Sequence, residues 1–194
     1  RRMLGGALAA VALPGAVRAQ GFAGLGTEAS GFALPRRRPL RFPADHAAHL
    51  GFRIEWWYLT ANLRDGAGRD LGIQWTLFRS ALRPPDGASG SDPGAPRTVA
   101  DTGGWSSPQL WMGHAGLTTP AQHFHAERLA RGGVGQAGVA LDPFRAWIDD
   151  WSLATPRDAD PADPLDRLSV AASGPDFAYR LELSAEGPLV PQGE

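Results

Sequence analysis

The residues with the most evident chemistry are Glu55-Trp56-Trp57-Tyr58, where a carboxyl group is followed directly by three large aromatic rings. A carboxyl group buried among aromatic rings tends to stay protonated, because its charged form loses hydration. Such a group could donate a proton to a substrate as a general acid. Arg79 offers the opposite arrangement, since an ion pair with Glu55 would keep the carboxylate charged and fix the pairing of two strands. The residues leave both interpretations open.

Histidines supply the next candidates. His123, His125 and Glu127 alternate along one predicted strand and therefore share a face. Imidazole and carboxylate groups both bind divalent metal ions, and His114 could add a third ligand. Solvated positions on the outside of a barrel explain the same pattern, and we predict no metal site. His114 lies among small neighbours, so it is either a hydrogen-bonded core residue or a pocket residue that contacts a ligand or passes a proton.

The segments that carry Glu55 and Arg79 predict a long antiparallel hairpin. Residues 53–63 are rich in aromatic and β-branched side chains, and residues 70–78 alternate between apolar and polar or small residues with a period of two. Residues 64–69 form a polar loop that contains glycine, as in hairpin connections. Large aromatic side chains occur on both faces of the first strand. We therefore expect both faces to be covered, or one face to line a ligand cavity.

The rest of the chain predicts an all-β fold. Further strands are expected over residues 105–117, 123–129, 168–172 and 177–183, with an irregular stretch at 132–142. Residues 144–153 fit a helix, because Trp147 and Trp151 are four positions apart, or a strand, because Ile148, Asp150 and Ser152 alternate. The pattern gives about eight strands and no convincing amphipathic helix, which is typical of an antiparallel β-barrel or sandwich. Residues 80–104 are turn formers and predict a long loop that is either a lid or a simple insertion.

The N-terminus and the composition predict an exported protein. Two arginines, an apolar run to Val17 and small residues before Ala19 predict a Tat-type signal peptide over residues 1–19. The apolar run is shorter than the roughly 20 residues that span a bilayer. Residues 20–41 form an irregular lead-in. A net charge of −1 without a basic block argues against nucleic acid as a partner, and the absence of cysteine excludes disulfides. We expect a periplasmic or secreted protein.

Several motifs resemble one known family. Glu55-Trp56-Trp57-Tyr58, followed by Gly72-x-Gln74-x-Thr76-x-Phe78-Arg79, resembles the first domain of the AttH/CrtC family, whose lipocalin-like members include carotenoid 1,2-hydratases. Segments 111–117, 124–128 and 147–151 follow in the order of the family, and residues 187–193 resemble its interdomain linker. The resemblance implies a lipocalin-like barrel or sandwich over residues 42–186, the first of two such domains, and it favours a strand over residues 144–153. The linker would begin in residues 187–194, and the second domain is missing from this chain.

The resemblance also implies a function and a site. A lipocalin-like barrel can hold one small ligand, and an aromatic lining suits an apolar isoprenoid or polyene. The resemblance implies that the protein hydrates a C=C bond, since aromatic faces stabilise the cation formed by protonation. It implies catalytic roles for Glu55 and His114 and no cofactor. The implied ligand-binding residues are His49, Trp56, Trp57, Tyr58, Gln74, Trp75, Arg79, Trp111 and Trp151.

Two other functions fit the same residues. A non-catalytic periplasmic carrier would have the same barrel, with Glu55 paired to Arg79 instead of free to donate a proton. A tryptophan-rich β-sandwich that binds carbohydrate would expose Trp57 and Trp75 as flat platforms. The expected partners are an apolar small molecule, the Tat export machinery and the second lipocalin-like domain.

Overall fold

Two antiparallel sheets form the body of the protein. The structure is a computed structural model that describes residues 31–85, 104–156, 158, 165–188 and 190. The first sheet has the order β1-β2-β3-β4, and its strands are β1 (Ile54–Arg64), β2 (Asp70–Ala81), β3 (Gln109–Thr118) and β4 (His123–Arg131). The second has the order β5-β6-β7-β8-β9, with β5 (Ala137–Leu141), β6 (Phe144–Ile148), β7 (Trp151–Ala154), β8 (Arg167–Ser173) and β9 (Ala178–Ser184).

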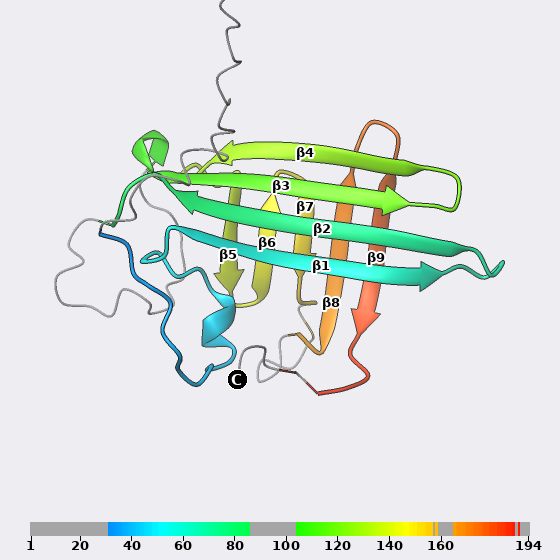
Figure 1. Ribbon diagram of the computed structural model, residues 1–194, viewed down its shortest axis with the longest axis horizontal. Coiled ribbons are helices and arrows are strands. Elements are labelled where there is room, and N and C mark those ends of the chain that lie inside the picture. The colour runs from blue at the N-terminus through cyan, green and yellow to red at the C-terminus, as the bar shows by residue number, and fades with distance from the viewer. Residues whose placement is uncertain (1–30, 86–103, 157, 159–164, 189, 191–194) are drawn as a thin grey trace, which may run out of the picture. The chain divides into compact units, whose positions relative to one another are not determined.

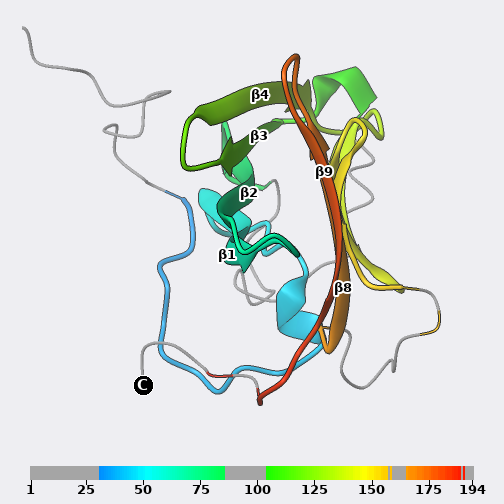
Figure 2. The ribbon, with the colours of Figure 1, turned by 90° about the vertical axis from the view of Figure 1, so that its right-hand side faces the viewer.

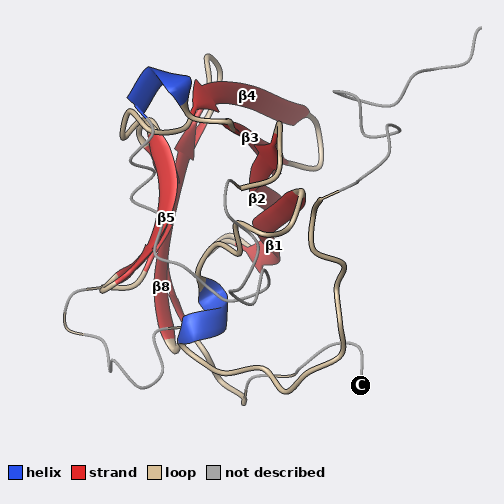
Figure 3. Cartoon of the chain, turned by 90° about the vertical axis from the view of Figure 1, so that its left-hand side faces the viewer, coloured by secondary structure: helices blue, strands red, loops and turns tan. Residues whose placement is uncertain are grey.

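The strands of the two sheets cross at a steep angle. In Figure 1, β1 to β4 run across the view while β5 to β9 run up and down behind them. Figure 2 shows the second sheet nearly edge-on, with the first sheet on one side of it. The described chain has only two short 3₁₀ helices, η2 (Ala44–His46) and η3 (Gly104–Ser106), which stand out in Figure 3. The predicted all-β fold is confirmed, and the two layers form a sandwich with crossed strands.

Tryptophan fills the space between the sheets. Trp75 on β2, Trp111 on β3 and Trp151 on β7 are fully buried and belong to one hydrophobic cluster that takes side chains from both sheets. Each of these rings removes a large apolar area from water, which suits a chain without cysteine. Tyr179 on β9 ties the sheets together, because its hydroxyl donates a 2.7 Å hydrogen bond to the carbonyl of Gln74 on β2.

The predicted hairpin is confirmed, and the structure supplies its register. β1 and β2 pair along their full length, and residue Glu55 lies opposite Arg79. The inward face of β1 packs against the core, whereas Trp56 and Tyr58 on its other face are 57% and 64% exposed. The expectation that both faces are covered is therefore wrong for β1. Its outer face meets solvent.

The single strand expected over residues 144–153 is wrong. Asp149 and Asp150 form a tight turn that separates β6 from β7, and Asp149 has a φ of 52°, in the left-handed region. The side chain of Gln136 donates a 2.8 Å hydrogen bond to the Asp149 carboxylate and supports this turn. Aspartate tolerates the left-handed conformation better than most residues do. The described chain therefore has nine strands instead of about eight.

Other predictions fall on residues that the structure does not describe. The predicted signal peptide, the first part of the lead-in and most of the loop over 80–104 lie outside the described residues. Residues 33–40 of the lead-in are irregular, as expected. Within the described residues, no helix has the length and apolar character needed to cross a membrane.

Candidate functional site

Glu55 and Arg79 form the centre of a buried polar network. They face each other across the β1-β2 ladder, and both point toward the inside of the sandwich. Arg79 is completely buried, and its guanidinium approaches the Glu55 carboxylate through Nε at 3.0 Å and a terminal nitrogen at 2.8 Å. The ion pair expected as an alternative to a catalytic acid is therefore present. It lies at the start of the edge strand β1, next to the segment that contains η2.

The remaining donors of Arg79 bind the chain around it. One terminal nitrogen donates to the side-chain oxygen of Gln109 at 2.7 Å. The other donates to the carbonyls of His49 and Phe52 at 2.9 and 2.8 Å. Burial lowers the pKa of Arg79, and the Glu55 carboxylate opposes this shift. The fork of the guanidinium thus joins β2, β1, β3 and the segment before β1 in one network.

His49 lies between two carboxylates. Its Nδ1 is 2.7 Å from Glu55 Oε1 and its Nε2 is 3.3 Å from Asp45 Oδ1. Nε2 also lies 3.5 Å from the guanidinium of Arg38, so a donor and an acceptor both approach this nitrogen. The hydrogen bond to Glu55 raises the pKa of His49 despite partial burial. Asp45 also accepts two hydrogen bonds from Arg38, which lower the pKa of Asp45 strongly.

These contacts leave little freedom for Glu55 to act as an acid. Its two oxygens accept hydrogen bonds from the His49 backbone N–H at 2.8 Å, from the His49 ring and from Arg79. All of these partners are donors, which is the pattern of an ionised carboxylate. A cavity of about 280 Å³ lies beside the network, lined by Asp45, Ala47, His49, Ile54, Glu55, Trp56 and Trp57.

The tryptophans expected to line a ligand cavity occupy different environments. Trp75, Trp111 and Trp151 are in the packed core, and the Trp151 indole donates a 2.9 Å hydrogen bond to the Ser173 carbonyl. Trp57 is half-buried and donates a 3.0 Å hydrogen bond from its indole to the His46 carbonyl. Neither Trp57 nor Trp75 is an exposed platform, so the criterion for the carbohydrate-binding alternative is not met.

The outer face of the β1-β4 sheet is where the other predicted residues gather. Side chains that alternate with the core set form four rows across the strands. In order along β1 the rows are Trp56, Phe78, Met112 and Leu129; Tyr58, Thr76, His114 and Glu127; Thr60, Gln74, Gly116 and His125; and Asn62, Gly72, Thr118 and His123. The first row is apolar, the second is mixed and the last two are polar or glycine. The face therefore changes from apolar to polar along the strands.

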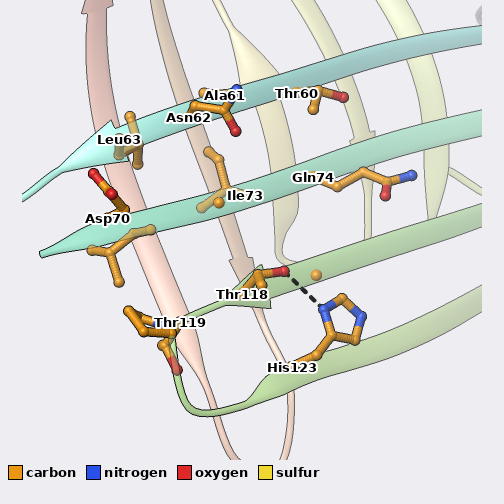
Figure 4. Close-up of a pocket in the computed structure, with 14 residues that line it drawn as sticks. Thr60, Ala61, Asn62, Leu63, Asp70, Ile73, Gln74, Thr118, Thr119 and His123 are labelled. Atoms are coloured by element: carbon orange, nitrogen blue, oxygen red, sulfur yellow. Dashed lines mark hydrogen bonds between the residues drawn. The ribbon is translucent and has the colours of Figure 1, made fainter.

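A hollow of about 730 Å³ lies at the polar end of this face (Figure 4). Gly72 and Gly116 lie at its floor, where the outward side chains of two neighbouring strands are missing. Side chains that line it include Thr60, Asn62, Gln74, Thr118 and His123. An adjoining cavity of about 160 Å³ shares Gln74, Gly116 and His123 with the hollow and is also lined by His114, His125 and Glu127. The two cavities follow one another along the face.

His114 belongs to this outer face and not to the core. Its Nε2 lies 3.8 Å from the Glu127 carboxylate on the neighbouring strand, and its ring contacts Phe78 edge-on with centroids 5.4 Å apart. The predicted common face of His123, His125 and Glu127 is confirmed. Among the described residues, no group of three or more histidine, cysteine or acidic side chains has a spacing that could hold a metal ion.

The structure brings together some of the predicted site residues and separates others. His49, Glu55 and Arg79 form the ion network, and the outer face carries Trp56, Tyr58, Gln74 and His114. Sequence reasoning missed Thr60, Asn62, Thr118 and the two glycines of the hollow. Their signal in the sequence is weak, because polar residues that alternate with apolar ones indicate only a solvated face.

Comparisons with known proteins agree on one family. The AttH-like family matches residues 33–194. A crystal structure from Nitrosomonas europaea, of a protein provisionally described as AttH, is similar, with a TM-score of 0.56 and 30% sequence identity. The similarity covers 81% of this chain and 41% of that one, so the matched part of this chain spans less than half the length of that protein. No curated protein matches the chain.

Proposed function

Because the chain belongs to the AttH-like family of lipocalin-like proteins, we propose that it binds an amphipathic small molecule on the outer face of the β1-β4 sheet and does not itself hydrate it. Binding of an apolar, isoprenoid-like molecule is what the resemblance implied. The proposal moves the ligand from the interior to the outer face. Export through the predicted signal peptide is part of the proposal and rests on the sequence of residues 1–19.

The observation that carries the proposal is the change from apolar to polar along the outer face. Trp56 and Leu129 at the apolar end are 57% and 63% exposed, and the hollow over Gly72 and Gly116 lies at the polar end. Trp56 and Asn62 are six positions apart along β1, which corresponds to roughly 20 Å at about 3.3 Å per residue. A ligand with an apolar body and a polar head of about this length matches the face. Exposed apolar rows bounded by polar groups are typical of binding surfaces.

The packed interior supports the choice of the outer face. Trp75, Trp111 and Trp151 fill the space between the sheets, where a lipocalin-like barrel would otherwise hold its ligand. A bound polyene would have to displace at least one of these rings. On the outer face, no core side chain has to move.

The ion network supports the non-catalytic part of the proposal. A general acid must give its proton to the substrate, and Glu55 instead accepts hydrogen bonds from Arg79 and His49. Freeing the carboxyl group would leave the guanidinium buried without its ionic partner, at a high cost in free energy. Glu55 is better suited to holding the start of β1 against β2 and the preceding segment.

The test uses retinol, a fluorescent polyene alcohol, with the full-length protein that contains this chain. Retinol fluorescence and energy transfer from tryptophan report binding, and mass spectrometry of the recovered ligand in labelled water reports hydration. We expect saturable binding that is weakened by Trp56→Ala and unchanged by Trp105→Ala. Trp105 is a suitable control because it is 78% exposed and lies on η3, outside the four rows.

The outcomes separate the functions. Retinol recovered unchanged, with binding that depends on Trp56, supports a carrier. Retinol recovered with one added water, and loss of that product in Glu55→Gln, would show a hydratase and overturn the non-catalytic part of the proposal. Binding that is equally insensitive to both tryptophan substitutions would exclude the outer face.

A further inference from the structure

The hollow at the polar end of the outer face is lined by groups that can form hydrogen bonds, among them Thr60, Asn62 and Gln74. We infer that it binds an uncharged, hydroxyl-rich head group, such as a sugar or another polyol, at the end of the ligand. This inference rests on the proposed function and adds the class of ligand. It depends on the shape of the hollow, on its hydrogen-bonding groups and on the charges around it.

Two glycines give the hollow its shape. Gly72 lies opposite Thr118, and Gly116 lies opposite Gln74, on the adjacent strands β2 and β3. A methyl group on Gly72 would lie 3.5 Å from Thr118 Cβ, and one on Gly116 would lie 3.4 Å from His123 Cε1. These are ordinary contact distances, so alanine fits the fold at both positions. It would occupy the floor of the hollow, where a head group could otherwise approach the backbone.

The side chains around the floor can both donate and accept hydrogen bonds. Thr60, Asn62 and Gln74 line the hollow from β1 and β2. Within the described chain, the only hydrogen bond of the Gln74 side chain is a long contact of 3.5 Å to Thr76. Hydroxyl and amide groups that can serve in both roles match a hydroxyl-rich head group, whose own groups also donate and accept. A plain hydrocarbon end would leave these groups without partners.

His123 is held in place at the rim. Its Nδ1 lies 2.8 Å from the Thr118 hydroxyl, and its ring lies over the position where Gly116 has no side chain. The other ring nitrogen, Nε2, takes no part in that contact and can donate or accept according to the tautomer. An oriented imidazole beside amide and hydroxyl groups extends the same hydrogen-bonding surface.

The charges around the hollow argue against an ionic head group. Among the residues that line it, Asp70 alone carries a formal charge at neutral pH, and the lining includes no lysine or arginine. An anionic head group would therefore lack the charge-assisted donors that phosphate and carboxylate sites use. A cationic head group would meet only Asp70, whose carboxylate is already 2.8 Å from Arg64 Nε.

The experiment compares ligands that share one dodecyl chain. Dodecyl maltoside, dodecanol, dodecanoate and dodecyltrimethylammonium are titrated into the full-length protein, and binding is measured by calorimetry. Dodecanol is kept below its solubility limit and the other three ligands below their micelle concentrations. We expect dodecyl maltoside to bind at least about tenfold more tightly than either ionic ligand. Gln74→Ala and Asn62→Ala should each weaken dodecyl maltoside by about two- to tenfold, as expected for one lost hydrogen bond, and leave dodecanol unchanged.

Two glycine substitutions, one in the hollow and one control outside it, test the shape of the hollow. Gly72→Ala should weaken dodecyl maltoside, whereas Gly66→Ala should not. Gly66 lies in the β1-β2 turn, where an added methyl group would have no other atom within 4 Å. Circular dichroism checks that both variants are folded. If Gly72→Ala is not folded, Gln74→Ala provides an independent test of the site.

Each outcome has a distinct meaning. Tighter binding of dodecanoate or the ammonium ligand than of dodecyl maltoside would overturn the inference about the head group. Equal affinity for all four ligands would also overturn it, and the proposed function would stand. Failure of all four to bind would refute the proposed function itself.

Discussion

Replacing Arg79 by methionine tests whether the Glu55 network holds the fold. The change keeps an unbranched side chain of similar length and removes every donor. It takes from Glu55 its ion pair with the guanidinium, so that the carboxylate keeps only its contacts with His49. The side-chain oxygen of Gln109 and the carbonyl of Phe52 lose their hydrogen bonds with Arg79 as well. Arg79 is completely buried and the Glu55 side chain is only 13% exposed, so solvent cannot replace the lost contacts easily.

The expected cost follows from this burial. Removing one partner of a buried ion pair costs about 3–5 kcal/mol, because the remaining charge loses an ionic partner that solvent cannot easily replace. For a domain of this size, each kcal/mol lowers Tm by about 2–4 °C, so Tm should fall by roughly 6–20 °C. Urea unfolding should show a lower midpoint with an unchanged slope, since the surface exposed on unfolding is the same.

A double-mutant cycle gives the sharpest form of this test. Glu55→Leu alone leaves the guanidinium of Arg79 buried without its ionic partner, whereas Glu55→Leu combined with Arg79→Met removes both charges. The double variant should therefore be clearly more stable than the sum of the two single losses predicts. A cost below about 1 kcal/mol for Arg79→Met, or strict additivity in the cycle, would refute the structural role that we assign to the pair.

Three further predictions concern the ion network, the core and the contact between the sheets. His49 has a raised pKa, so its contribution to the free energy of unfolding is complete below about pH 6.5 and is lost as pH rises through the raised pKa. Asp45 has a lowered pKa, so its contribution to the free energy of unfolding is lost as pH falls below about 3.8. The free energy of unfolding against pH should therefore lose its alkaline decline in His49→Gln and part of its acid decline in Asp45→Asn; unchanged profiles would contradict these assignments. Gly113→Ala should destabilise the protein by about 1–3 kcal/mol in urea, because its methyl group would lie 2.7 Å from Ile148 Cγ2, and a neutral effect would show that the core can yield there. Tyr179→Phe should cost about 1 kcal/mol in thermal unfolding, because the hydroxyl of this half-buried side chain donates a 2.7 Å hydrogen bond to the opposite sheet; no loss would mean that water replaces the hydrogen bond.

The features that could be predicted from the sequence are those determined by neighbouring residues. Alternation with a period of two and a glycine-containing loop give the β1-β2 hairpin, and its register places Glu55 opposite Arg79. The ion pair could therefore be expected as an alternative. Choosing between a pair and a free acid required the segment before β1, because His49 donates to Glu55 through both its backbone and its ring.

Other features depend on residues far apart in the chain. Both faces of β1 carry large aromatic side chains, and only the position of the second sheet decides that Trp57 faces the core and Trp56 faces solvent. The hollow combines Thr60 and Asn62 with Thr118 and His123, which β2 and β3 bring together. No local pattern marks such a combination, and polar alternation alone suggests only a solvated surface.

The turn between β6 and β7 was missed for a different reason. Tight hairpin turns are usually marked by Asn-Gly or Asp-Gly, because glycine adopts a positive φ without strain. Here Asp149 adopts a φ of 52° with support from Gln136, a residue 13 positions earlier. The residues on either side fit a helix or a strand, and the family resemblance favoured one continuous strand.

The most direct test of the outer-face site is an NMR titration of the seven tryptophan indole groups of this chain with dodecyl maltoside, in the full-length protein. Single Trp→Phe substitutions assign the indole N–H signals. The account predicts that the signal of Trp56 moves in a saturable way, while those of Trp75, Trp111 and Trp151 in the core stay in place. Movement of the three core signals with Trp56 unchanged would place the ligand between the sheets and contradict the account.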